Sequence, residues 1–556
     1  MDRGPGSYAS ALHAHARTLN SLTHPPSCAH AHAHLVSAPP PQGWFDQWGL
    51  GQRIRHTSDI LYGISRALAY GLSFHNFYML SGGSNFGYSA AWGVTTAYAP
   101  DTAIDSYLLR HEPKFSTFQA FFSAVEGIAD ALLGNPVPLT PTPLGASCQL
   151  QEYGPVAFVS NLALGANGTE VVSVHGQALL VPNHTVIILS AGKVVFNTSA
   201  ALDAPRAARP APALQPLPLR SAAWVTVAEE LGYGQRSAAA APGSLPLEQL
   251  NLTENLVDYM YYSLQLDAAV NASTLSVGTC GGEYVYVFVG GARAPLRYAH
   301  APPPRAAELP THHFALPASS LARVSILVSA MGLSTSPSPA SCKGLRHVSA
   351  GGQDLSTRGW TSRWVFAGEA GQWYTAEGSA SAPWAPVAPQ GGSVPTSWFK
   401  ALLPHPAPAA AAAAAQLAAA QQRPQAPPPQ LAYALDMQGA TKGVAWVNGF
   451  NIGRYNLEAG HCTGECAPPF HGPICYIFWR NCNSSTQRFY HVPESVLVPG
   501  DNLVVLFEEA VEVPSTGGGP VAPSPPPLPA QQRAAPPGGG ARDLSTVALV
   551  ALTEHP

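Results

Sequence analysis

The sequence predicts a multidomain, mostly β protein, and three observations lead to this fold class. A length of 556 residues corresponds to about three to four domains. Glycine (51) and proline (55) are abundant and only 11% of the residues are charged, which favours short strands and turns over long helices. Short runs with strand character, separated by turn signals, recur from Cys148 to Glu509.

The composition argues against two classes of partner. A formal net charge of −4 gives no reason to expect nucleic acid or an acidic membrane surface, so we expect neither. No apolar run reaches the roughly 18 residues that a spanning helix requires, and we expect no membrane span. The opening residues 1–20 lack the sustained apolar region of a secretory signal peptide.

Residues 1–42 are rich in Ala, His and Pro and are predicted to be a low-complexity segment. The tract CAHAHAHL (28–35) places histidines at alternating positions, a pattern that can bind a metal. A single tract without a second cluster of ligands is more typical of low complexity, so we expect no metal and no cofactor.

The first regular elements are predicted between residues 43 and 135. A helix is indicated by apolar residues at helical spacing: Ile60, Leu61, Ile64 and Leu68. The aromatic-rich run 72–80 predicts a buried strand, and Gly82-Gly83 after it predicts a turn where the backbone can approach a ligand. A further helix is predicted over 115–133.

Two motifs in this region, GWFDQWG (43–49) and NFYMLSGGSNFG (76–87), resemble the end of the catalytic barrel of family 35 β-galactosidases. The resemblance implies a partial (β/α)8 barrel remnant followed by β-sandwich and jelly-roll (galactose-binding-like) domains. It also implies that Trp44 and Tyr78 line a galactose pocket. The substrate or partner would then be a β-galactoside or a cell-wall glycan.

The same resemblance shows what this sequence lacks. Retaining glycosidases use one carboxylate as nucleophile and another as acid/base. The nucleophile position, four residues before the GW motif, is Pro39, and Pro41 replaces a pocket tyrosine. The Asn-Glu-Tyr-Gly strand that carries the acid/base is absent, and no glutamate precedes Glu112. We therefore expect no catalytic residue in this chain.

The stretch TAYAPDTAIDSY (96–107) resembles a family loop but has Pro100 at the position of a tyrosine that contacts the sugar. Asp101 and Asp105 could be read as substitute catalytic groups. We interpret them as loop-capping residues, because an aspartate is shorter than a glutamate and these two lie on the wrong strand for the reaction.

The rest of the chain is divided by composition and strand patterns. The predicted domains are 43–135 (the C-terminal part of a barrel), 145–202 (a small β-sandwich), 203–246 (a Pro/Ala-rich connection), 247–380 (a jelly roll), 390–512 (a terminal jelly roll) and 513–556 (a disordered tail). An Ala/Pro/Gln insertion, 405–428, is predicted to be disordered.

The segment KGVAWVNGFNIGRY (442–455) predicts a hairpin with a type I′ turn at Asn448-Gly449. It resembles the terminal jelly roll of plant-type β-galactosidases. Trp446 and Tyr455 could stack on a sugar, but packing in the core of the sandwich is the preferred interpretation.

Four cysteines fall within one stretch, namely Cys462, Cys466, Cys475 and Cys482. Their spacing lacks the CxxC pairs of zinc sites, so two local disulfides are favoured over a metal site. Six N-glycosylation sequons begin at Asn167, Asn183, Asn197, Asn251, Asn271 and Asn483. Together these features favour a secretory history, and the resemblance implies a secreted, extracellular, cell-wall or vacuolar protein.

Two functional hypotheses follow. The chain either derives from a retaining β-galactosidase that releases terminal galactose, here without its two glutamates and inactive as written, or it is a non-catalytic secreted carbohydrate-binding protein. It is read as a fragment of a longer enzyme or as a truncated descendant. The sequence upstream of residue 43 would distinguish these origins.

Overall fold

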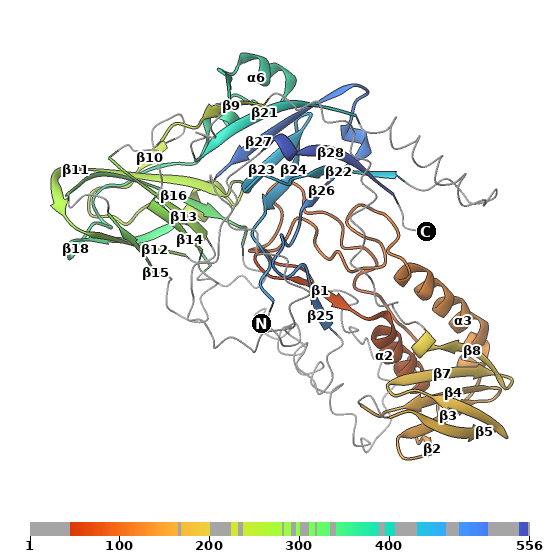
Figure 1. Cartoon of the computed structure of the whole chain (residues 1–556). Coiled ribbons are helices and arrows are strands. Elements are labelled where there is room, and N and C mark those ends of the chain that lie inside the picture. Colours follow the sequence, from red (N-terminus) through yellow and green to blue (C-terminus); the bar gives the residue numbers. More distant parts are fainter. Residues whose placement is uncertain are drawn as a thin grey trace, which may run out of the picture.

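A computed structural model describes the following residues: 45–164, 168–200, 224–231, 237–280, 283–290, 296–300, 311–316, 320–333, 341–387, 395–405, 431–462, 477–509 and 544–553. Within them the protein is mostly β, as predicted, and its sheets form several layered units (Figure 1). The low-complexity segment 1–42 and almost all of the insertion 405–428 lie outside the described residues.

The first unit, here called the helix-covered sheet, has the strand order β2-β3-β4-β7-β8. Its elements are α2 (Thr57–Ala69), α3 (Lys114–Gly134), β2 (Thr142–Pro143), β3 (Cys148–Tyr153), β4 (Val156–Asn161), β7 (Thr185–Ser190) and β8 (Lys193–Asn197). The hairpin β5 (Glu170–Val174) and β6 (Gln177–Val181) accompanies it. Figure 1 shows α2 and α3 lying beside this sheet.

Alternation along the strands explains the layers of this unit. On β4, Phe158 faces a core that it shares with α2 and α3, while Ala157 and Val159 face a core that includes residues of β5 and β6. Successive strand residues point to opposite faces, so both faces of the sheet are buried. The apolar face predicted for α2 packs here, since Ile60, Leu61 and Ile64 are all buried.

The middle sandwich pairs a sheet of order β10-β19-β11-β16-β13-β14 with a sheet of order β15-β12-β17-β18. Its strands are β10 (Ser237–Ala239), β11 (Tyr259–Asn271), β12 (Thr274–Thr279), β13 (Glu283–Val289), β14 (Leu296–His300), β15 (Thr311–Ala315), β16 (Ser320–Ala330), β17 (Leu345–Ala350), β18 (Gln353–Asp354) and β19 (Thr361–Arg363). The short helix α4 (Gln249–Thr253) precedes β11. The disulfide Cys280–Cys342, which sequence reasoning did not pair, links residues next to β12 and β17.

The terminal sandwich pairs a sheet of order β20-β9-β21-β27-β23-β24 with a sheet of order β26-β22-β28. Its strands are β9 (Val225–Ala228), β20 (Ala385–Pro386), β21 (Ser397–Pro404), β22 (Leu431–Asp436), β23 (Lys442–Val447), β24 (Phe450–Asn456), β26 (Phe489–Val492), β27 (Asp501–Glu508) and β28 (Ala548–Thr553). Short helices α5 (Ala367–Ala370) and α6 (Ala376–Ser381) connect it to the middle sandwich.

The hairpin predicted in the terminal sandwich is confirmed. Strands β23 and β24 pair through Val447 and Phe450, and the two turn residues have positive φ, 47° at Asn448 and 87° at Gly449. A type I′ turn requires positive φ at both positions, which asparagine and glycine tolerate best. Trp446 and Tyr455 are buried in the core beside this turn, so their predicted packing role is confirmed too.

The middle and terminal sandwiches share one hydrophobic core. Tyr259 and Tyr261 of β11 point away from the middle core and toward Phe366 and Phe507, with the Tyr259 and Phe507 ring centroids 5.1 Å apart. Aromatic rings bury large apolar areas, so this shared layer fixes the two sandwiches to each other.

The barrel-type region differs from the prediction. Between residues 45 and 133 the structure has one strand and two helices, as expected in number, but the strand is β1 (Gln52–Arg55). The predicted strand over 72–80 is wrong: this run forms no strand, and Phe74, Tyr78 and Leu80 are exposed. A strand needs a neighbouring backbone along its length. Here the N–H of Ile104 donates to the backbone oxygen of Leu80 at 3.0 Å, at the end of the run, and this contact does not extend into a ladder.

Two predicted boundaries also need correction. The connection 203–246 contains β9 and β10, which join the terminal and middle sandwiches. The predicted disordered tail 513–556 contains β28, which pairs along its length with β22. Composition failed here because a short strand inside a Pro- and Ala-rich stretch is specified by its distant partner rather than by its neighbours.

The predicted local disulfides are confirmed for one pair. Cys462 and Cys482 are bonded, whereas Cys466 and Cys475 lie outside the described residues. Among the described helices, none combines the length and the apolar character needed to cross a membrane.

Candidate functional site

The candidate site begins at Tyr78, the predicted sugar-contacting residue. Its side chain is 58% exposed, although it follows a run of aromatic residues. The neighbouring Tyr98 is half-buried, and burial, followed by the interaction with the Tyr78 side chain, raises the pKa of Tyr98 to about 12. Trp44, the other predicted contact residue, lies outside the described residues, as do Pro39 and Pro41.

The aromatic surface continues from Tyr98 through ring contacts. The ring centroids of Tyr98 and Phe45 are 5.8 Å apart. The guanidinium carbon of Arg53 lies 5.8 Å from the Phe45 ring and 5.8 Å from the Trp479 ring. We call these five residues, Tyr78, Tyr98, Phe45, Arg53 and Trp479, the aromatic row.

Arg53 is held rigidly in the aromatic row. Its Nη1 donates to the backbone oxygen of Phe45 at 2.6 Å and its Nη2 donates to Oε1 of Gln47 at 3.1 Å. Burial lowers the pKa of the guanidinium, and the nearby Asp46 carboxyl acts in the opposite direction. A buried arginine that contacts two rings fixes the positions of both rings.

Asp46 lies beneath the row and is fully buried. Its Oδ1 accepts a hydrogen bond from the backbone N–H of Arg53 at 3.0 Å, and its Oδ2 has no hydrogen-bond partner among the described residues. Burial raises the pKa of Asp46 to about 7, and the charge of Asp101 contributes in the same direction. This carboxyl is therefore half protonated near neutral pH.

Asp101 has a structural role. Its Oδ2 forms a 2.8 Å ion pair with Nζ of Lys114 and accepts the backbone N–H of Arg55 at 2.7 Å. Both charged side chains are almost completely buried, at 2% and 4% exposure. A carboxylate held in this way is an anchor rather than a reacting group, in agreement with the interpretation from sequence.

Asp105 caps its own loop, as predicted. Its Oδ1 accepts the backbone N–H groups of Tyr107 and Leu109 at 2.9 and 3.0 Å. Aspartates commonly satisfy backbone donors in turns in this way. The Tyr107 hydroxyl in turn donates to the backbone oxygen of Phe489, which fixes this loop to the terminal sandwich.

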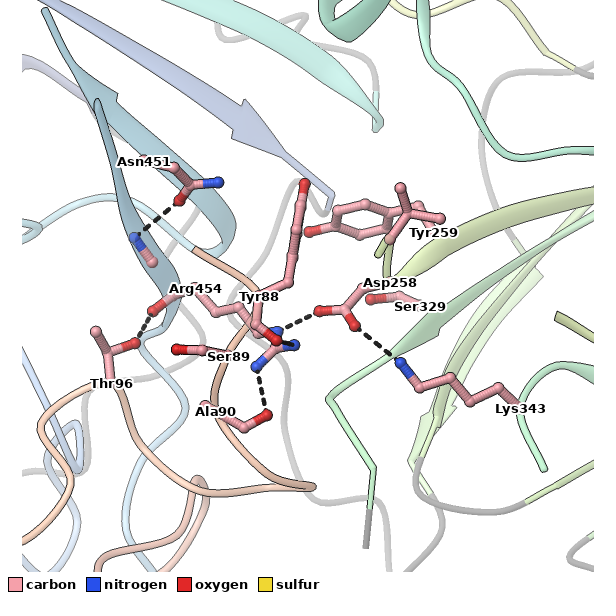
Figure 2. Close-up of polar contacts among 12 residues, drawn as sticks. Tyr88, Ser89, Ala90, Thr96, Asp258, Tyr259, Ser329, Lys343, Asn451 and Arg454 are labelled. Carbon is pink, nitrogen blue, oxygen red and sulfur yellow. Dashed lines mark hydrogen bonds and ion pairs between the residues drawn. The ribbon is translucent and has the colours of Figure 1, made fainter. Parts of the chain in front are cut away.

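A second group of polar residues joins the three parts of the chain (Figure 2). Arg454 of β24 forms a buried ion pair with Asp258, which also pairs with Lys343 at 3.2 Å. The Arg454 guanidinium donates to the backbone oxygens of Ala90 and Tyr88 at 3.0 and 2.8 Å. We call Arg454, Asp258 and Lys343 the junction triad, because they connect both sandwiches and the barrel-type region.

The junction triad has a structural function. All three side chains are only about 3% exposed, and Thr96 adds a hydrogen bond to the backbone oxygen of Arg454. Because all three side chains are buried and paired, the triad offers no accessible group to a ligand. Sequence reasoning did not find it, because Asp258 and Arg454 are 196 positions apart.

No group of three or more His, Cys, Asp or Glu side chains within the described part of the chain is arranged to hold a metal ion. What the candidate site offers is an exposed tyrosine, aromatic faces and fixed donors. Such surfaces suit ligands that have both apolar faces and hydroxyl groups.

Two segments of the chain match known protein families. Residues 27–125 match "Glycosyl hydrolases family 35", and residues 422–502 match "Beta-galactosidase, galactose-binding domain". The first match contains four of the five residues of the aromatic row, and the second contains all residues from Leu431 of β22 to Val492 of β26. These two segments are therefore similar to a family 35 glycosidase and to the galactose-binding domain of β-galactosidases.

A curated relative narrows the assignment. "Beta-galactosidase 8" of Arabidopsis thaliana is 28% identical over 505 residues, which cover 84% of this chain and 54% of the relative. Most of the chain is thus similar to a β-galactosidase. It spans about half the length of the curated relative that it matches.

Proposed function

We propose that this chain binds β-galactosides at the Tyr78 end of the aromatic row and, with the sequence given, does not hydrolyse them. The observation that carries the proposal is the exposed Tyr78, which neighbours Tyr98 within the region that matches family 35. An exposed hydroxyl beside aromatic faces supports recognition of a sugar. The ligand class, a β-galactoside, follows the relative's name and the family matches, and a cell-wall glycan is the source that the sequence resemblance implies.

The absence of turnover is argued from the carboxylates. Retaining hydrolysis requires two carboxyl groups roughly 5–5.5 Å apart on either side of the glycosidic bond. Pro39 occupies the position that the resemblance assigns to the nucleophile. The described acids nearest the row do not replace it, because Asp101 is paired with Lys114 and Asp46 is buried beneath the row.

The test uses the purified chain in two assays. We expect no release of nitrophenol from nitrophenyl β-galactoside above background, but measurable binding of methyl β-D-galactoside by isothermal titration calorimetry. Tyr78→Ala is expected to weaken that binding at least tenfold. Tyr70→Ala, at an aromatic residue 39% exposed at the end of α2, is the matched control and should bind as the original chain does.

A second candidate function is β-galactosidase activity itself, which the family matches favour. Turnover that disappears in Asp46→Asn or Asp101→Asn would establish this alternative, since it would reveal a relocated carboxylate. A lack of both turnover and sugar binding would instead contradict the main proposal.

We further propose that the protein passes through the secretory pathway. Two disulfides, Cys280–Cys342 and Cys462–Cys482, support an oxidising compartment. Asn251, Asn271 and Asn483, which begin sequons, are exposed. Secreted material treated with an N-glycosidase is expected to lose mass, and replacing these three asparagines by glutamine should remove most of that shift. An unchanged mass on glycosidase treatment would count against the assignment.

A further inference from the structure

The terminal sandwich contributes a strand to the barrel-type region. Strand β25 (Ile477–Arg480) pairs antiparallel with β1, and Trp479 lies directly opposite Arg53. Directly opposed residues point to the same face of a sheet, so these two side chains are neighbours. Trp479 thus joins the aromatic row through its contact with Arg53. In the sequence it lies more than 380 residues after both Tyr78 and Tyr98.

The segment that carries β25 is anchored at both ends. The disulfide Cys462–Cys482 closes it, and its base pairs with the barrel-type region through the bridge between Leu50 and His461. On the other side, Thr486 donates to the backbone oxygen of Leu50 at 2.6 Å. These contacts hold the base of the segment, so β25 has a fixed position beside β1.

The two ends of the aromatic row differ in chemistry. At one end the Tyr78 and Tyr98 hydroxyls offer hydrogen bonds. At the other end, the half-buried Trp479 offers an indole face adjoining the Arg53 guanidinium. An indole combines a large apolar face with one polar edge, which suits the less polar face of a sugar ring next to a fixed cation.

We propose that Trp479 is a contact residue for a second sugar unit, so that the preferred ligand is a β-linked galactose oligosaccharide rather than a single galactose. This inference rests on the proposed function, which assigns the first sugar to Tyr78. A row of successive aromatic contacts provides a binding surface longer than one tyrosine. Trp479 extends this surface in the direction of the terminal sandwich.

The experiment compares methyl β-D-galactoside with a β-linked galactotriose by isothermal titration calorimetry. The original chain is expected to bind the trisaccharide at least five times more tightly than the monosaccharide. Trp479→Ala should abolish this preference while leaving the dissociation constant for the monosaccharide within twofold. Trp479→Phe, which keeps an aromatic face, is the matched control and should retain most of the preference.

Each outcome separates this inference from the function on which it depends. If the original chain binds neither sugar, the proposed function fails and this inference falls with it. If it binds both sugars equally, or if Trp479→Ala keeps the preference, only the role of Trp479 is overturned. Loss of both ligands in a folded Trp479→Ala chain would likewise show that Trp479 supports the site without contacting a second sugar. If the alanine chain does not fold, Trp479→Leu takes its place.

Discussion

Replacing Asp258 by alanine is expected to destabilise the protein by about 3–5 kcal/mol, because the change leaves two buried cations without their common partner. Arg454 and Lys343 are each 3% exposed and cannot turn toward water without disrupting their surroundings. Urea unfolding followed by tryptophan fluorescence measures the loss, since several tryptophans lie in the shared core.

The control for this prediction is Glu152→Ala. Glu152 pairs with His175 on the surface, with 42% and 62% exposure, and such pairs contribute about 0–1 kcal/mol. The double change Asp258→Ala with Arg454→Met should be non-additive by about 1 kcal/mol or more, since the methionine removes one unpaired charge. Full additivity, or a loss for Asp258→Ala no larger than that for Glu152→Ala, would contradict the role of the junction triad.

Replacing Asp46 by asparagine is expected to stabilise the protein at pH 8 and to have little effect at pH 4. The pKa of Asp46 is about 7 in the folded state and 3.8 in a solvated aspartate. Between these values the folded chain retains a proton that the unfolded chain has lost, so stability falls as pH rises, by about 1.4 kcal/mol per pH unit at most. Above pH 7 the folded protein bears the full cost of burying the charged Asp46 carboxylate, on the order of 2–4 kcal/mol.

Thermal unfolding at pH 4, 6 and 8 checks this prediction, and the quantity compared is the difference in unfolding temperature between the Asp46→Asn variant and the original chain. Asp267→Asn, at an exposed position on β11, is the control and should show no difference at any of the three values. A variant that is destabilised equally at pH 4 and pH 8 would show that the Asp46 carboxyl stabilises the fold through contacts rather than opposing it through burial.

The parts of the fold that sequence could predict depend on local chemistry. The apolar spacing of Ile60, Leu61 and Ile64 predicts α2, and the Asn448-Gly449 pair predicts the hairpin of β23 and β24. Both could be predicted because neighbouring residues specify them. The capping role of Asp105 is local as well, since it binds backbone groups two and four positions along the chain.

The parts that sequence could not predict depend on distant partners. The run 72–80 has the composition of a buried strand, but the backbone contact between Leu80 and Ile104 at its end does not extend along the run, so the run forms no strand. Strand β28 lies in a stretch that has the composition of a disordered tail, yet it forms a strand because β22 pairs with it along its length. Arg53 and Trp479 entered the candidate site only through the pairing of β1 with β25, for which the sequence carries no local signal.

The bonds from Arg454 to Tyr88 and Ala90 also constrain the order in which the protein can be completed during synthesis. The ribosome makes Tyr88 366 residues before Arg454. At about 5–20 residues per second, the barrel-type region waits roughly 20–70 s for its partner. Strand β9 likewise emerges long before β21, and β22 emerges more than 100 residues before its partner β28. The aromatic residues of these early segments therefore need protection on the nascent chain, and synthesis of the distant partner strands rather than local folding completes the terminal sandwich.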